Sequence, residues 1–146
     1  MSRAVIVATI VTSMIAVSSP SLAASDAEIV SLGDKMSGAF RCSTYASIFH
    51  DQKERQRLFQ IGLKVGRDYV EGLKSRDDPT SELSTFIRAA PTDFVVGQMY
   101  ESESTHAYDE VVKNQNGPSL KQWLDADEAK IQAELRYRQS NCSSIQ

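Results

Sequence analysis

Histidine and cysteine are both scarce in this sequence of 146 residues. Only His50 and His106 are present, which excludes a site built on several imidazoles. The two cysteines, Cys42 and Cys142, lie far apart, so the chain lacks the Cys-x-x-Cys pair that redox enzymes use. It also lacks a Gly-x-Ser-x-Gly turn, on which many hydrolases carry a serine nucleophile. A catalytic site would have to be built from few residues.

Positive charge and long apolar runs are limited as well. The chain has 16 basic and 19 acidic side chains, for a net charge of −3. This balance argues against nucleic acid and anionic membrane surfaces as partners, because both attract basic proteins. The apolar run from Ala4 to Val17 has 14 residues, fewer than the roughly 20 that a membrane-spanning helix needs.

That apolar run belongs to a typical export leader. A short positive start, Met1 to Arg3, precedes it, and small residues from Ser18 to Ala24 follow it. We therefore expect residues 1–23 to be a secretory signal peptide and residues 24–146 to form a single helical domain. Loss of Arg3 with the leader takes the net charge from −3 to −4. We expect a periplasmic or secreted protein with no membrane insertion after cleavage.

An exported chain with two cysteines is expected to join them. A Cys42–Cys142 disulfide would tie the first helix to the end of the last. Closing a loop of about 100 residues stabilises a fold by up to about 4.7 kcal/mol in the chain-entropy model.

Apolar residues recur at intervals of three and four over most of the chain, which predicts helices. The expected fold is all-α, a bundle of four to five helices closed by the Cys42–Cys142 disulfide. The first expected helix covers residues 26–49, with Gly38 as a candidate break, and the second covers about twenty residues from Leu58. The third covers residues 82–89, and the fourth covers residues 94–113, with Thr92 or Asp93 as its cap. A capping box formed by Ser119 and Gln122 would begin the last helix.

Two glycines interrupt the inner face of the second predicted helix. Gly62 and Gly66 are four residues apart, and each lowers helix propensity by roughly 1 kcal/mol relative to alanine. Close packing of another helix would offset that penalty. The alternative is a groove that admits a ligand or a partner's side chain.

The fourth predicted helix carries the most suggestive surface. Glutamates and aspartates concentrate within ten residues there, and aromatic side chains alternate with them. Such a surface suits protein–protein contact and electrostatic steering, although an ordinary solvated helix face has the same composition. The candidate partner-binding residues are Tyr100, Glu101, Glu103, His106, Asp109 and Glu110.

Catalytic and metal-binding interpretations are weaker. Glu103 and His106 form one Glu-x-x-His unit, whereas di-iron bundles use that unit twice. His50 and Glu54 form a second histidine–carboxylate pair, at a spacing of four residues. Serines beside His106 cannot easily reach the geometry of a nucleophile, base and orienting acid from one helix. We expect no cofactor, no metal and no enzymatic activity.

These features favour a small helical binding protein that inhibits or neutralises another extracytoplasmic protein, such as a basic cell-wall hydrolase. In its size, its leader and its single disulfide the chain resembles periplasmic immunity proteins of toxin systems and small acid-stress chaperones. The resemblance assigns no role to any individual residue. A periplasmic acid-stress chaperone is the first alternative function. A small metal-binding or hydrolytic enzyme using His106 and nearby carboxylates is the second.

Overall fold

The computed structural model of the protein describes residues 25–76, 82–114, 122–123 and 125–146. These residues form five α-helices, one 3-10 turn and a pair of two-residue strands, so the predicted all-α fold is confirmed. The elements are α1 (Asp26–Ile48), α2 (Gln52–Lys74), α3 (Glu82–Ala89), α4 (Thr92–Val112), β1 (Lys113–Asn114), β2 (Gln122–Trp123), α5 (Ala126–Gln139) and η1 (Cys142–Ser144).

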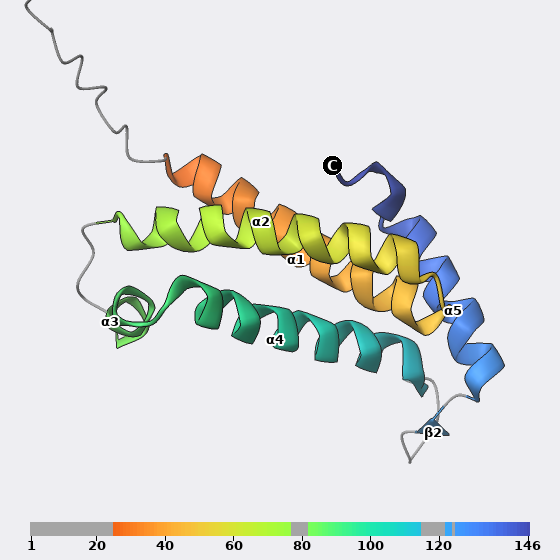
Figure 1. Cartoon of the computed structure of the whole chain (residues 1–146). Helices are drawn as coiled ribbons and strands as arrows, with labels where there is room; N and C mark the ends of the chain where they lie inside the picture. Colours follow the sequence, from red (N-terminus) through yellow and green to blue (C-terminus); the bar gives the residue numbers. More distant parts are fainter. Residues whose placement is uncertain (1–24, 77–81, 115–121, 124) are drawn as a thin grey trace, which may run out of the picture.

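The two longest helices form an antiparallel hairpin that sets the shape of the molecule. Figure 1 shows α1 and α2 side by side, with α4 running along them and α3 at the end where α2 finishes. Helix α5 crosses the opposite end of the hairpin (Figure 1). Strands β1 and β2 pair antiparallel in the connection between α4 and α5. None of the helices in the described part of the chain is long and apolar enough to cross a membrane.

The first hairpin differs from the sequence prediction at two points. Helix α1 continues through Gly38, so the expected break is absent. Helix α2 begins at Gln52 rather than near Leu58, because the Asp51 side chain accepts a hydrogen bond of 3.0 Å from the Glu54 backbone N–H and caps the helix. The polar stretch that separates the predicted helices therefore forms the first turns of α2. His50 reverses the chain, with a positive φ of 67°.

The starts of α4 and α5 also correct the prediction. Helix α4 begins two residues earlier than expected, with Pro91 at its N-cap and no side-chain cap bond, so neither Thr92 nor Asp93 is the cap. Helix α5 is capped by Asp125, whose side chain accepts a 2.8 Å hydrogen bond from the Glu128 N–H. The predicted capping box is wrong, because Gln122 lies in β2; its partner Ser119 is outside the described residues.

Two apolar clusters hold the helices together. The first joins the middle of α1 and α2 to α3 and the start of α4; its buried members are Met36, Phe40, Val65, Val70, Ile87, Val95 and Val96. The second joins the end of α1 to the start of α2, the end of α4, α5 and η1; its buried members are Cys42, Tyr45, Leu58, Ala107, Val111, Val112, Ala129, Ala133 and Cys142.

Gly62 and Gly66 are packing positions and not the walls of a groove. A Cβ on Gly62 would lie 2.4 Å from the ring of Phe40, and one on Gly66 would lie 2.9 Å from Val96 and 3.2 Å from the sulfur of Met36. Side chains from α1 and α4 therefore fill the space that the two glycines leave. This close approach offsets their low helix propensity.

The predicted disulfide is confirmed. Cys42 in α1 and Cys142 in η1 are bonded, with their Cα atoms 5.6 Å apart and a sequence separation of 100 residues. Both cysteines are buried in the second apolar cluster. The bond therefore fixes the chain immediately after α5 against the hairpin.

Candidate functional site

Helix α4 does not present the six predicted binding residues as one surface. Only Glu101 and His106 are exposed. Tyr100 is half-buried and packs edge-on against two rings, with centroids 5.2 Å from Phe40 and 5.0 Å from Phe59. The remaining three, Glu103, Asp109 and Glu110, are half-buried and bonded to neighbouring side chains.

Glu110 is the most strongly held of these residues. Both of its carboxylate oxygens lie 2.7 Å from Nη2 of Arg41 in α1, and the Tyr45 hydroxyl donates a 2.8 Å hydrogen bond to Oε2. Nε2 of His106, one turn earlier in α4, lies 3.3 Å from Oε1. Glu110 therefore joins α4 to α1 instead of offering a free charge to a partner.

The surroundings of Glu110 act on its pKa in opposite directions. Burial favours the neutral acid and raises the pKa, whereas the hydrogen bonds from Arg41 and Tyr45 favour the carboxylate and lower it. The pKa of Glu110 lies below its ordinary value, because the hydrogen bonds and the positive charge of Arg41 together outweigh burial, the largest single effect. Burial and the same carboxylate raise the pKa of the Tyr45 hydroxyl.

Two of the other three acidic residues, Glu103 and Asp109, also have side-chain partners. The Ser37 hydroxyl of α1 donates a 2.9 Å hydrogen bond to Glu103. Asp109 forms an ion pair with Lys113, four residues along the chain. The ion pairs of Asp109 with Lys113 and of Glu110 with Arg41 offset two of the negative charges on α4, so this surface is less acidic than the sequence indicates.

A different row of residues occupies the outer face of α4. Phe94, Glu101 and Tyr108 are all exposed and follow one another at seven-residue intervals, which places them close to one line along the helix. The exposed fractions of Phe94 and Tyr108 are 52% and 46%. Along the helix axis the backbone positions of Phe94 and Tyr108 are about 21 Å apart, since the rise is about 1.5 Å per residue. Phe94 is not among the candidate binding residues predicted from the sequence, because an apolar residue at the start of a helix gives no local signal of its exposure.

Phe94 has an aromatic neighbour from α3. The rings of Phe86 and Phe94 are 6.3 Å apart in a tilted edge-on arrangement, and 47% of Phe86 is exposed. Asp93 beside them forms a 2.6 Å ion pair with Arg67 of α2. The corner between α3 and α4 thus presents two large rings on a fixed backbone.

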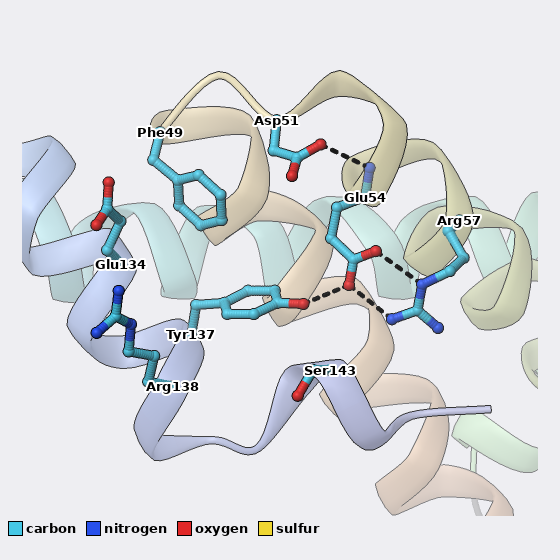
Figure 2. Close-up of a pocket in the computed structure, with 8 residues that line it drawn as sticks. All are labelled: Phe49, Asp51, Glu54, Arg57, Glu134, Tyr137, Arg138 and Ser143. Atoms are coloured by element: carbon cyan, nitrogen blue, oxygen red, sulfur yellow. Dashed lines mark hydrogen bonds and ion pairs between the residues drawn. The ribbon is translucent and has the colours of Figure 1, made fainter.

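A hollow in the described surface lies elsewhere, where α2 begins against α5. This cleft has a volume of about 450 Å³. Figure 2 shows Tyr137 extending from α5 toward Glu54 of α2, with the ring of Phe49 nearby. The rings of Phe49 and Tyr137 are 5.4 Å apart and nearly perpendicular. The lining residues are Phe49, Asp51, Glu54, Arg57, Glu134, Tyr137, Arg138 and Ser143.

Hydrogen bonds within the cleft already use its central charges. Glu54 accepts bonds of 2.8 and 2.6 Å from Arg57 and a further bond from the Tyr137 hydroxyl. Arg57 also donates to the carbonyl of Ile145 at 2.5 Å and to that of Cys142 at 3.4 Å. The Glu54–Arg57–Tyr137 network therefore fastens α5 and the C-terminal turn to α2.

The network shifts the pKa of each acidic member. The Arg57 hydrogen bonds lower the pKa of Glu54, and the Tyr137 hydrogen bond adds to this effect. Burial raises the pKa of Tyr137 to about 12, and its bond to the Glu54 carboxylate acts in the same direction. Both Glu54 oxygens and most Arg57 donors are therefore occupied by bonds within the protein and are not free to bind a ligand.

Catalytic arrangements gain no support from the geometry. In the described ranges, no group of three or more His, Cys, Asp and Glu side chains could hold a metal ion. His50 lies outside both helices, so it does not form the helical pair with Glu54. His106 lies beside Glu110, and within the described part of the chain it makes no hydrogen bond to Ser102 or Ser104.

Comparison of the chain with protein-family models, with curated proteins and with solved structures found no match.

Proposed function

We propose that the protein is an extracytoplasmic binding protein that engages another protein through the outer face of α4 and inhibits it. The observation that carries the proposal is the row Phe94, Glu101 and Tyr108, in which two half-exposed rings flank an exposed carboxylate. Aromatic side chains are enriched among the residues that dominate binding energy at protein interfaces. A buried disulfide and two apolar clusters hold this face in place.

Rigidity of α4 favours binding over catalysis. The helix is packed against α1 and α2 along its inner side, and Glu110 fastens it to Arg41. A preformed helix face loses little conformational entropy on association, which favours affinity. The exposed Glu101 and the net charge of −4 after removal of residues 1–23 would steer the protein toward a basic partner, such as a cell-wall hydrolase.

The test uses protein purified after expression of the full chain. Wild type, Phe94→Ser/Tyr108→Ser and the control Val30→Ser would be incubated with envelope and secreted fractions at two salt concentrations. Val30 is a matched control because 60% of it is exposed, on α1. We expect the wild type and the control to retain one stoichiometric partner that the double variant loses, and the retained partner to be inhibited in an activity assay.

Two results would contradict this function. The first is retention of no partner by the wild type at either salt concentration. The second is equal retention by the wild type and the double variant. In addition, Glu101→Lys should weaken the complex chiefly at low salt, since screening already suppresses the steering effect of exposed charges at high salt.

The acid-stress chaperone remains a second candidate because carboxylates join the helices. Glu110 holds α4 to Arg41 and Tyr45, and α4 supplies Val95 and Val96 to an apolar cluster. The pKa of Glu110 is lowered in the folded state, so its contribution to stability is complete above the unfolded-state pKa of about 4.5 and is lost as the pH falls through the folded-state pKa. Release of α4 would then expose apolar surface.

Dye binding distinguishes the chaperone from the inhibitor. A chaperone should show rising fluorescence of an apolar-surface dye between pH 5 and pH 2, together with protection of a client protein from aggregation. The variant Glu110→Gln should begin this rise at higher pH. Fluorescence that stays flat over the whole range would exclude the chaperone.

A further inference from the structure

The outer face of α5 carries an apolar pair that the fold leaves uncovered. The exposed fractions of Ile131 and Leu135 are 64% and 46%. They lie four residues apart, one turn along the helix, so they form one continuous patch. The helix buries its opposite side, with Ala129 and Ala133 in the second apolar cluster. Ile131 and Leu135 have the four-residue spacing that is typical of a buried helix face, whereas the structure places both outside the core.

Charged residues border this patch at both ends. Glu128 lies one turn before Ile131, and Arg138 lies one turn after Leu135. Both side chains are exposed, and neither is engaged in an ion pair within the described residues. We name the four residues Glu128, Ile131, Leu135 and Arg138 the α5 stripe.

We propose that the α5 stripe is a self-association surface on which a second copy of the chain docks its own α5 in antiparallel orientation. The sequence of the stripe is self-complementary in that orientation. About a two-fold axis at position 133, Ile131 faces Leu135 of the partner subunit, and Glu128 faces Arg138 of the partner subunit. Each contact occurs twice, as a two-fold interface requires. The helix dipoles are also opposed, which is favourable.

Charge complementarity decides the orientation. In a parallel pair the two Glu128 side chains would face each other, and so would the two Arg138 side chains, which is repulsive. The antiparallel register would bring Lys130 opposite Arg136 of the partner subunit, but both lie more than about 100° around the helix from the centre of the stripe. Like charges are therefore kept out of the contact.

One helix on each side buries less area than a standard interface, so we expect a weak dimer with a Kd between micromolar and millimolar. The Kd of this dimer is measured by sedimentation velocity over a range of protein concentrations. The protein is purified after expression of the full chain. Glu128→Arg and Arg138→Glu should each raise the Kd about tenfold or more, because each variant places like charges opposite each other twice. Arg136→Glu is the matched control, since it makes the same charge change in the same turn outside the stripe, and it should change the Kd by less than about twofold.

Mixing the two stripe variants provides the decisive measurement. An equimolar mixture of Glu128→Arg and Arg138→Glu should form a heterodimer, because one subunit then carries two positive and the other two negative side chains at the contact. A fluorescent label on one of the two variants makes the formation of the heterodimer measurable. The proposal is overturned if the wild type stays monomeric at millimolar concentration, if Arg138→Glu behaves like Arg136→Glu, or if the mixture gives no heterodimer. Far-UV circular dichroism of each variant confirms that the fold is intact.

Discussion

The packing of the two central helices leads to a sharp prediction about glycine. Gly62 and Gly97 both lie inside long helices, α2 and α4. A Cβ on Gly62 would approach two carbons of the buried Phe40 ring to 2.4 and 2.5 Å, whereas a Cβ on Gly97 would have no neighbour within 4 Å. The same substitution by alanine should therefore change stability in opposite directions.

The expected magnitudes follow from two opposing effects. Alanine gains about 1 kcal/mol of helix propensity over glycine at either position. At Gly62 the added methyl overpacks the core, at a cost of about 3 kcal/mol, since Phe40 is confined by Phe59 and Tyr100. Gly62→Ala should thus destabilise the fold by about 2 kcal/mol. Gly97→Ala should stabilise it by about 0.5 to 1 kcal/mol.

Guanidinium unfolding of the two oxidised variants, followed by far-UV circular dichroism, measures this difference. The free energies of unfolding should differ by about 3 kcal/mol, or by about 10 °C in Tm. If Gly62→Ala is as stable as the wild type, the close packing of Phe40 against α2 is incorrect. If Gly97→Ala is destabilised, this position of α4 is not open.

Three further predictions concern the bonds that join distant segments. Glu110→Gln should lower the free energy of unfolding by about 1 to 2 kcal/mol at pH 7. The difference in free energy of unfolding between this variant and the wild type should vanish as the pH falls below the lowered pKa of Glu110. Urea unfolding at several pH values measures both effects. Spectrophotometric titration should find a tyrosine hydroxyl with a pKa of about 12, and Tyr137→Phe should remove it; persistence of that transition would refute the bond to Glu54. Replacing Cys42 and Cys142 by alanine should destabilise the fold by up to about 4.7 kcal/mol; an unchanged denaturation midpoint would show that the disulfide does not constrain the unfolded chain.

Local patterns in the sequence were sufficient for much of the fold. The all-α class followed from apolar periodicity, and the short third helix, Glu82–Ala89, was predicted with its observed bounds. The disulfide followed from the presence of two cysteines behind a predicted export leader. These inferences succeed because periodicity and turn chemistry act over a few residues, and because two cysteines allow only one intramolecular pairing.

The same local patterns failed where two signals competed. The polar residues after Asp51 resemble a loop in composition, but the cap at Asp51 makes them the start of α2. The Ser119–Gln122 pattern resembles a helix start, whereas α5 begins after a second cap at Asp125. The choice between two possible helix starts depends on the tertiary contacts that each of them would make, and local sequence patterns do not contain those contacts.

The sequence by itself determined the helical class and the disulfide, while tertiary structure decided which side chains are available to a partner. Glu110 belongs to a charged segment of α4, yet Arg41, at a separation of 69 residues, binds it and removes it from the candidate surface. Ile131 and Leu135 fit a core pattern, yet α5 turns its alanines inward. The reason is physical: periodicity shows that a helix has distinct faces, but only contacts with other helices decide which of them is buried.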